Sequence, residues 1–112
     1  MPKGYAIFTL KVNDEAGFNG YIEAATPTVL DAGASLIVAG PPADVVEGNW
    51  YGNRTAILEF PSVEAAERWY RSSEYQRVIG KRHAAAESNV VIIGGFEMPT
   101  DAHSETAAVS LD

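Results

Sequence analysis

The sequence contains no cysteine. This absence excludes disulfide scaffolds, thiolate nucleophiles and thiolate metal sites. Long apolar runs are absent too, and none approaches the roughly 20 residues that a helix needs to span a bilayer. The first residues, Met1 to Tyr5, lack the basic and apolar stretches of a signal peptide. We therefore expect a cytosolic (cytoplasmic) protein with no membrane partner.

Basic residues are scarce. The 112 residues include eight lysines and arginines but 15 aspartates and glutamates, so the formal net charge is −7. A surface with this charge repels phosphate backbones unless a local basic patch intervenes. The one basic cluster lies at 77–83, and Glu74 and Glu87 flank it. We therefore expect no nucleic-acid partner.

Motifs that hold metals or cofactors are also missing. The two histidines, His83 and His103, do not form an i, i+4 pair. The sequence has neither a phosphate-binding glycine loop nor a Gly-x-Ser-x-Gly nucleophile motif. It therefore predicts no metal site and no cofactor.

Strand-like and helix-like segments alternate along the chain. In chain order, we expect a strand over 5–12, a helix over 14–32, strands over 35–39 and 54–60, a helix from Ser62, a further helix over 73–87 and a strand over 89–96. This β-α-β-β-α-β order has its second helical region broken in two. It is the order of a ferredoxin-like α+β sandwich with an antiparallel sheet.

Particular residues set the expected boundaries of the helices. Asp14 is a helix N-cap, and Gly33 ends the helix that Asp14 begins. Pro27 lies inside that helix and should kink it, because proline removes one hydrogen bond. The segment Ser73–Gln76 has capping-box spacing, so we expect a new helix to start there.

Two segments lack a regular pattern. Residues 43–53 are rich in turn signals, although Val45 and Val46 allow a short ribbon there. Residues 97–112 are polar and rich in alanine and serine, so we expect a mobile C-terminal tail. This leaves 1–96 as the single domain, since a chain of this length fits one domain.

The expected strands are apolar on both faces. In the first strand, Ala6, Phe8 and Leu10 form one apolar face and Ile7 keeps the other apolar, while the last strand has an unbroken apolar run at 90–93. Two helical regions cover only one face of the sheet, and an exposed apolar patch marks an interface. We therefore expect a homodimer that packs sheet on sheet with two-fold symmetry. The alternative is that the irregular loop or the tail folds over this face.

Several short segments resemble one known family. They are VEGNW at 46–50, LEFPS at 58–62, AAERWY at 65–70 and SEYQ at 73–76. Together they are similar to the DUF 1330 family, a bacterial family of unknown function, over nearly the whole chain from Gly4 to Gly95. The resemblance implies a dimeric α/β barrel. That superfamily includes cofactor-free monooxygenases, isomerases and dehalogenase-like enzymes, whose active sites lie in a cavity between sheet and helices. No catalytic motif accompanies the family, so none is carried over.

Arg82 is the most informative candidate residue. It shares an apolar helical stripe with Tyr75, Ile79 and Ala86. A guanidinium in such surroundings needs a partner, because an unpaired buried charge is costly. That partner could be an anionic ligand held bidentately, an ion pair with Glu59, or water reached by the end of the side chain.

His83 follows Arg82, and its side chain has an ordinary pKa that suits proton transfer near neutrality. Consecutive residues lie about 100° apart on a helix, so both side chains could border one pocket. Arg82 would bind an anion there and His83 would move a proton, which makes these two the predicted catalytic residues. A half-exposed histidine without a catalytic role is the alternative.

Five further residues are candidates for substrate binding: Tyr21, Trp50, Glu59, Trp69 and Tyr70. Aromatic side chains with polar ends suit a pocket for a ring-bearing or carboxylate substrate, although they also fill ordinary cores. If Leu58 faces the helices, Glu59 points to the other sheet face, where its carboxylate is either paired or a perturbed acid. Trp50 lies on a turn-rich loop, so either a ligand or the partner subunit should cover it.

Two functional readings remain open. In the first, the protein is a cofactor-free enzyme that acts on a small aromatic or carboxylate metabolite in a pocket between sheet and helices. In the second, it is a non-catalytic homodimer that binds a small molecule or has a structural role. The aromatic residues are then core, and Arg82 forms a salt bridge.

Overall fold

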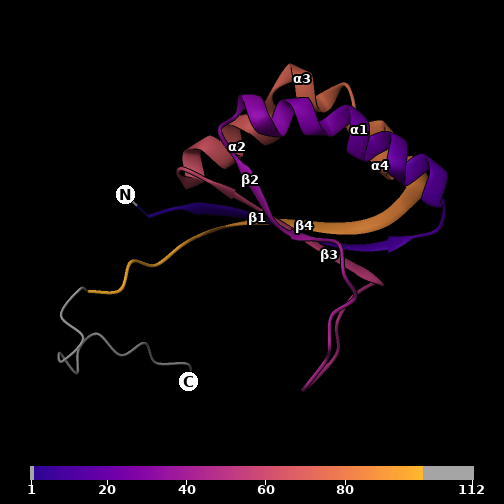
Figure 1. Ribbon diagram of the computed structural model, residues 1–112, viewed down its shortest axis with the longest axis horizontal. Coiled ribbons are helices and arrows are strands. Elements are labelled where there is room, and N and C mark those ends of the chain that lie inside the picture. Colours follow the sequence, from indigo (N-terminus) through magenta and orange to yellow (C-terminus); the bar gives the residue numbers. More distant parts are fainter. Residues whose placement is uncertain (1, 100–112) are drawn as a thin grey trace.

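The computed structural model of this chain describes residues 2–99. Its elements are β1 (Gly4–Val12), α1 (Glu15–Asp31), β2 (Ser35–Ala39), β3 (Arg54–Phe60), α2 (Val63–Arg71), α3 (Ser73–Gln76), α4 (Ile79–Ala85) and β4 (Ala86–Gly94). The strands form one antiparallel sheet in the order β2-β3-β1-β4, and the helices lie together on one side of it (Figure 1). This is the ferredoxin-like α+β fold that the element order predicts.

The ends of α1 lie where the capping residues predict them. The side chain of Asp14 accepts a hydrogen bond from the backbone N of Gly17 at 3.0 Å. Gly33 has a φ of 72°, in the left-handed region that favours glycine just beyond a helix. Pro27 lies inside α1, and the helix continues through it to Asp31. Its missing N–H therefore does not end the helix.

The second helical region differs from the prediction. Its break falls at 77–78, between α3 and α4, so a continuous helix over 73–87 does not form. The cap of α3 is Ser72 instead of Ser73, since the Ser72 Oγ accepts from the backbone N of Tyr75 at 3.1 Å. Among residues 2–99, no helix combines the length and apolar character needed to cross a membrane.

The last strand begins three residues earlier than predicted, at Ala86 instead of Asn89. Antiparallel pairing extends along β1 as far as Lys11 with Glu87 and Val12 with Ala86. The ladder therefore takes two residues that local propensity assigns to a helix, because tertiary pairing overrides a weak local preference.

The segment between β2 and β3 extends beyond the end of the sheet as a loop (Figure 1). The short ribbon considered at Val45 and Val46 does not form, and both side chains are exposed. The predicted mobile tail at 97–112 lies outside the described residues from position 100 onward.

The core lies between the sheet and the helices. Along β1, Ala6, Phe8 and Leu10 are buried, whereas the residues between them are partly exposed on the opposite face. The other large buried side chains are Phe18, Tyr21, Leu58, Phe60, Trp69, Tyr75 and Arg82. Aromatic rings therefore fill much of this layer, together with one buried guanidinium.

The opposite face of the sheet carries an apolar patch. Strand pairing places Ile7 between Ile57 and Val91, and it places Tyr5 beside Ile93. Val91 and Ile93 are 53% and 54% exposed. No helix of the described chain covers this face, since all four lie on the other side (Figure 1).

Candidate functional site

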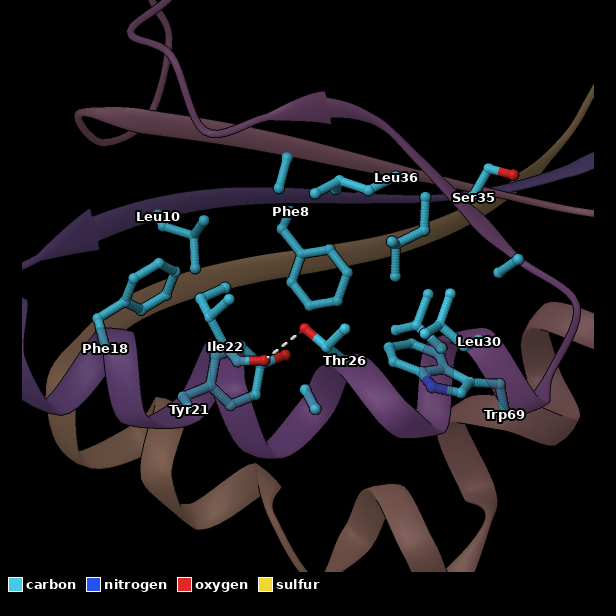
Figure 2. A pocket seen from close by; sticks show the side chains of 15 residues that line it. Phe8, Leu10, Phe18, Tyr21, Ile22, Thr26, Leu30, Ser35, Leu36 and Trp69 are labelled. Carbon is cyan, nitrogen blue, oxygen red and sulfur yellow. Dashed lines mark hydrogen bonds between the residues drawn. The ribbon is translucent and has the colours of Figure 1, made fainter.

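A cavity of about 260 Å³ lies between α1 and the sheet. Phe8 and Leu10 of β1 line it from the sheet, and Tyr21 and Thr26 line it from α1 (Figure 2). Trp69 of α2 lies at one end (Figure 2). The cavity therefore joins residues that are far apart in the sequence.

Small side chains leave the space beneath α1. Ala25 of α1, Ala34 before β2 and Ala56 of β3 all line the cavity. Protein interiors are otherwise close-packed, so a leucine at one of these positions would occupy much of the volume. The helix also packs along its side against α4.

Large apolar side chains surround the opening of the cavity. Ile22 and Leu30 of α1 and Leu36 of β2 are all exposed, and all three line the cavity. Exposed apolar clusters of this kind are found at binding sites more often than elsewhere on a protein surface.

The polar groups at the cavity are few and are mostly satisfied within the protein. The Thr26 hydroxyl donates to the backbone O of Ile22 at 2.7 Å, and the Trp69 indole N–H donates to the Thr28 hydroxyl at 3.0 Å. The Tyr21 and Tyr75 hydroxyl oxygens lie 2.6 Å apart. No charged residue of the described chain lines the cavity, so its walls suit an uncharged, largely apolar ligand.

Arg82 lies behind the cavity wall and does not line it. The side chain is only 2% exposed. Its Nε donates to the Tyr75 hydroxyl at 3.4 Å and its Nη1 donates to the Ser88 hydroxyl. The guanidinium carbon lies 5.4 Å from the centroid of the Phe8 ring and 6.0 Å from that of Tyr21. Cation–π contacts and two hydroxyls hold this buried charge.

The expected ion pair between Arg82 and Glu59 does not form, because the two side chains lie on opposite faces of the sheet. Glu59 alternates with the buried Leu58 and points away from the helices. Its carboxylate accepts from the Tyr5 hydroxyl at 3.1 Å and lies 3.9 Å from the Lys3 Nζ. Among residues 2–99, Arg82 has no carboxylate partner within 4.0 Å.

The Tyr21 hydroxyl near Arg82 has an altered pKa. Burial raises the pKa of Tyr21 well above its ordinary value of 10.0, the Tyr75 hydroxyl adds to this effect, and the Arg82 charge opposes it. Burial lowers the pKa of Arg82, but the oxygens of Tyr75, Tyr21 and Tyr70 outweigh this effect and raise it. At neutral pH the group therefore consists of a protonated Tyr21 phenol beside a charged guanidinium.

The aromatic candidates from α2 share one cluster around Tyr75. The ring centroid of Trp69 lies 4.1 Å from that of Tyr75, and that of Tyr70 lies 5.6 Å from it. Trp69 reaches the cavity, whereas Tyr70 does not line it. Tyr70 therefore supports the wall from behind.

The remaining sequence candidates lie away from the cavity. His83 is exposed on α4 and does not line the cavity, so the expected pocket between Arg82 and His83 does not form. One side chain points into the core and the next points outward, as consecutive residues on a helix do. Trp50 is exposed in the long loop, where its indole N–H donates to the Thr55 hydroxyl at 2.9 Å.

The sequence pattern does not single out Phe8, Thr26 or Ser88 as site residues, and it contains no local signal for them. It does put Tyr75 on the same helical stripe as Arg82, and the two side chains meet. That stripe was the one signal for the hydroxyl pair, since Tyr75 reaches Tyr21 only through the folding of α3 against α1.

Solved structures with the same fold include proteins of unknown and of known activity. A protein of unknown function from Rhodopseudomonas palustris is 16% identical, with a TM-score of 0.71 over 86% of this chain and 84% of that one. SnoaB, a cofactor-independent oxygenase from Streptomyces nogalater, is 9% identical, with a TM-score of 0.61 over 90% and 100%. A dimeric protein of unknown function from Bacteroides fragilis, with a ferredoxin-like fold, is 13% identical, with a TM-score of 0.56 over 82% and 95%.

These identities are low, so the likeness establishes the fold and not the activity. No curated protein matches the sequence significantly. A family model does match it over residues 3–96, which is most of the chain. The protein therefore belongs to the family described as a domain of unknown function, DUF1330.

Proposed function

We propose that this protein binds a small apolar or aromatic molecule in the cavity beneath α1. The observation that carries the proposal is an apolar cavity of about 260 Å³ with exposed apolar side chains at its opening. An apolar cavity of roughly 150 Å³ is enough to hold benzene. A bicyclic compound of the size of tetralin is therefore a suitable first probe.

An aromatic ligand is favoured over a carboxylate by the charges around the cavity. Arg82 lies behind Phe8 and Tyr21 and has its hydroxyl partners in Tyr75 and Ser88. Arg54, which lies over the Phe18 ring, is paired with Glu15. A carboxylate in the cavity would lose its hydration without gaining an ion pair, which is costly. Tetralin-1-carboxylate should therefore bind more weakly than tetralin.

A homodimer formed through the outer sheet face is part of this proposal. Ile7, Ile57, Val91 and Ile93 form an apolar patch there, on the side opposite to the cavity. A second copy packed on this patch would remove it from water and leave the opening of the cavity accessible. The dimeric relative of like fold from Bacteroides fragilis supports this assembly by analogy.

Calorimetric titration of the protein with tetralin tests the binding site. Ala25→Leu places a larger side chain in the cavity, so we expect it to weaken tetralin binding by roughly tenfold or more, because lost apolar contacts are worth about 1.5–3 kcal/mol. Ala84→Leu makes the same change at an exposed position of α4 and should leave binding unchanged. Equal affinities in both variants, or no binding by the wild type, would contradict the proposed site.

Catalysis without a cofactor is a second candidate function. The observation that favours it is the charged Arg82 guanidinium, one hydroxyl away from the cavity-lining Tyr21. A fixed charge at this place stabilises negative charge that develops on a substrate oxygen. The exposed His83 has no place in this arrangement, and its predicted proton-transfer role stays untested.

A further inference from the structure

Two phenol hydroxyls, those of Tyr21 and Tyr75, meet beside the cavity. The Tyr21 and Tyr75 oxygens lie 2.6 Å apart, so one hydroxyl donates to the other. Each phenol has a single hydrogen. The other neighbour of the pair, Arg82, has only donors to offer. One of the two phenolic hydrogens is therefore left without an acceptor among the described side chains.

Burial decides which hydrogen is left over. Tyr75 is completely buried and does not line the cavity, so an unmatched hydrogen there would lose its hydration without compensation. Tyr21 lines the cavity, where water or a ligand provides an acceptor. The stable orientation therefore runs from Arg82 to Tyr75 to Tyr21, and the Tyr21 hydrogen points toward the cavity.

Arg82 fixes the direction of these hydrogen bonds and makes Tyr21 a stronger donor. Because the guanidinium cannot accept, Tyr75 accepts from it. The only neighbour to which Tyr75 can then donate among the described side chains is the Tyr21 hydroxyl. Ser88 holds Nη1 of the same guanidinium, which limits the rotation of the side chain. Successive hydrogen bonds polarise one another, so the charge makes Tyr21 a better donor than an isolated phenol.

We propose that Tyr21 selects ligands that carry a carbonyl oxygen on an otherwise apolar ring system. Arg82 is the positioning residue that orients and polarises this donor through Tyr75. The inference rests on the proposed function, because it places the ligand in the same cavity. It goes further because it names the chemical class of the ligand. The ligand has one hydrogen-bond acceptor, needs no negative charge and is apolar elsewhere.

A matched pair of ligands tests this selectivity. Tetralin and 1-tetralone share a carbon skeleton, and only 1-tetralone has a carbonyl oxygen. We expect Tyr21→Phe to weaken 1-tetralone binding roughly three- to tenfold, the worth of one hydrogen bond, and to leave tetralin binding unchanged. Tyr51→Phe is the control, because Tyr51 is exposed in the loop and does not line the cavity.

The infrared carbonyl band of bound 1-tetralone tests the part of Arg82. A strong donor lowers the carbonyl stretching frequency, so the band should lie lower in the wild type than in Tyr21→Phe. Arg82→Lys keeps the charge but loses the planar geometry, and it should give an intermediate frequency. A purely structural role for Arg82 would change stability without moving the band.

The possible outcomes separate the two proposals. If tetralin binds but Tyr21→Phe leaves the 1-tetralone affinity and band unchanged, the selectivity is wrong and the binding site stands. If neither compound binds the wild type, both proposals are wrong. If only 1-tetralone loses affinity and its band moves upward in Tyr21→Phe, the inference is supported.

Discussion

Arg82 and Tyr21 illustrate how a buried charge is kept in this protein without a carboxylate partner. The guanidinium is surrounded by the Phe8 and Tyr21 rings and by the hydroxyls of Tyr75 and Ser88. Each of these contacts is weaker than a buried ion pair, but together they satisfy the donors that face them. The guanidinium is therefore held in the core although no carboxylate of residues 2–99 pairs with it.

The buried Tyr21 phenol should make stability depend on pH in the alkaline range. Its pKa in the folded protein is raised above the ordinary value of 10.0, so the folded state keeps a proton that the unfolded state releases. The contribution of this phenol to the free energy of unfolding is fully present below pH 10. As the pH rises beyond 10, the free energy of unfolding falls by about 1.4 kcal/mol per pH unit for one such group. Urea denaturation between pH 9 and about 11.5 measures this slope.

Tyr21→Phe should reduce that slope by roughly the contribution of one group, about 1.4 kcal/mol per pH unit. The exposed Tyr51 provides the comparison, since Tyr51→Phe should leave the slope as in the wild type. Identical slopes for all three proteins would show that Tyr21 ionises as freely in the folded chain as in the unfolded one.

In the region from α2 to β4, the local sequence pattern and the tertiary structure favour different boundaries for the helices and strands. A serine-rich corner at 72–73 offers two possible caps, and the sequence pattern favours Ser73 because of Gln76 three residues later. The structure uses Ser72, whose hydroxyl accepts from the Tyr75 backbone and donates to the carbonyl of Trp69. This choice turns the chain so that Tyr75 enters the core between Trp69 and Tyr21.

Serine substitutions at this corner should therefore have unequal effects. Ser72→Ala removes the cap of α3, and we expect a loss of about 1 kcal/mol in the free energy of unfolding. Ser73→Ala changes an exposed residue, and we expect an effect within about 0.5 kcal/mol. Chemical denaturation of both variants gives the two values, and a larger loss for Ser73→Ala would favour the capping box that the sequence suggested.

The sheet has an apolar surface on each of its two sides, and the two surfaces have different partners. One face packs against the helices and borders the cavity, and the other carries the outer patch of Ile7, Ile57, Val91 and Ile93. We propose that a second copy covers this patch, because all four helices already lie on the first face (Figure 1). The cavity and the proposed interface would then lie on opposite sides of the same strands.

Val91→Asp should dissociate such a dimer. It places a charge at the centre of the patch, and an unpaired charge in an apolar interface is costly. Val46→Asp makes the same change on an exposed loop residue and should leave the assembly intact. Sedimentation velocity at micromolar concentration distinguishes the species. A wild-type protein that sediments as a monomer under these conditions would contradict the interface.

Much of the fold was predictable from local patterns. Asp14 and Gly33 mark the limits of α1, and the predicted ranges for β2 and β3 agree with the observed Ser35–Ala39 and Arg54–Phe60. Each of these boundaries is set by residues that are close together in the sequence, so the sequence alone is enough to predict it. The start of β4 was not predictable in this way, because Ala86 joins the sheet through its pairing with Val12.

In the candidate site, too, some features were predictable from the sequence and others were not. Residue types and their spacing were enough to show that Arg82 needs a partner, that the strands carry apolar residues on both faces and that no thiol takes part. The folded arrangement was needed to show that its partners are the hydroxyls of Tyr75 and Ser88, that Glu59 lies on the other face and that three alanines line a cavity. Spacing along a helix or strand reveals which way a side chain points relative to its neighbours. What it meets there depends on elements that are distant in sequence and adjacent only after folding.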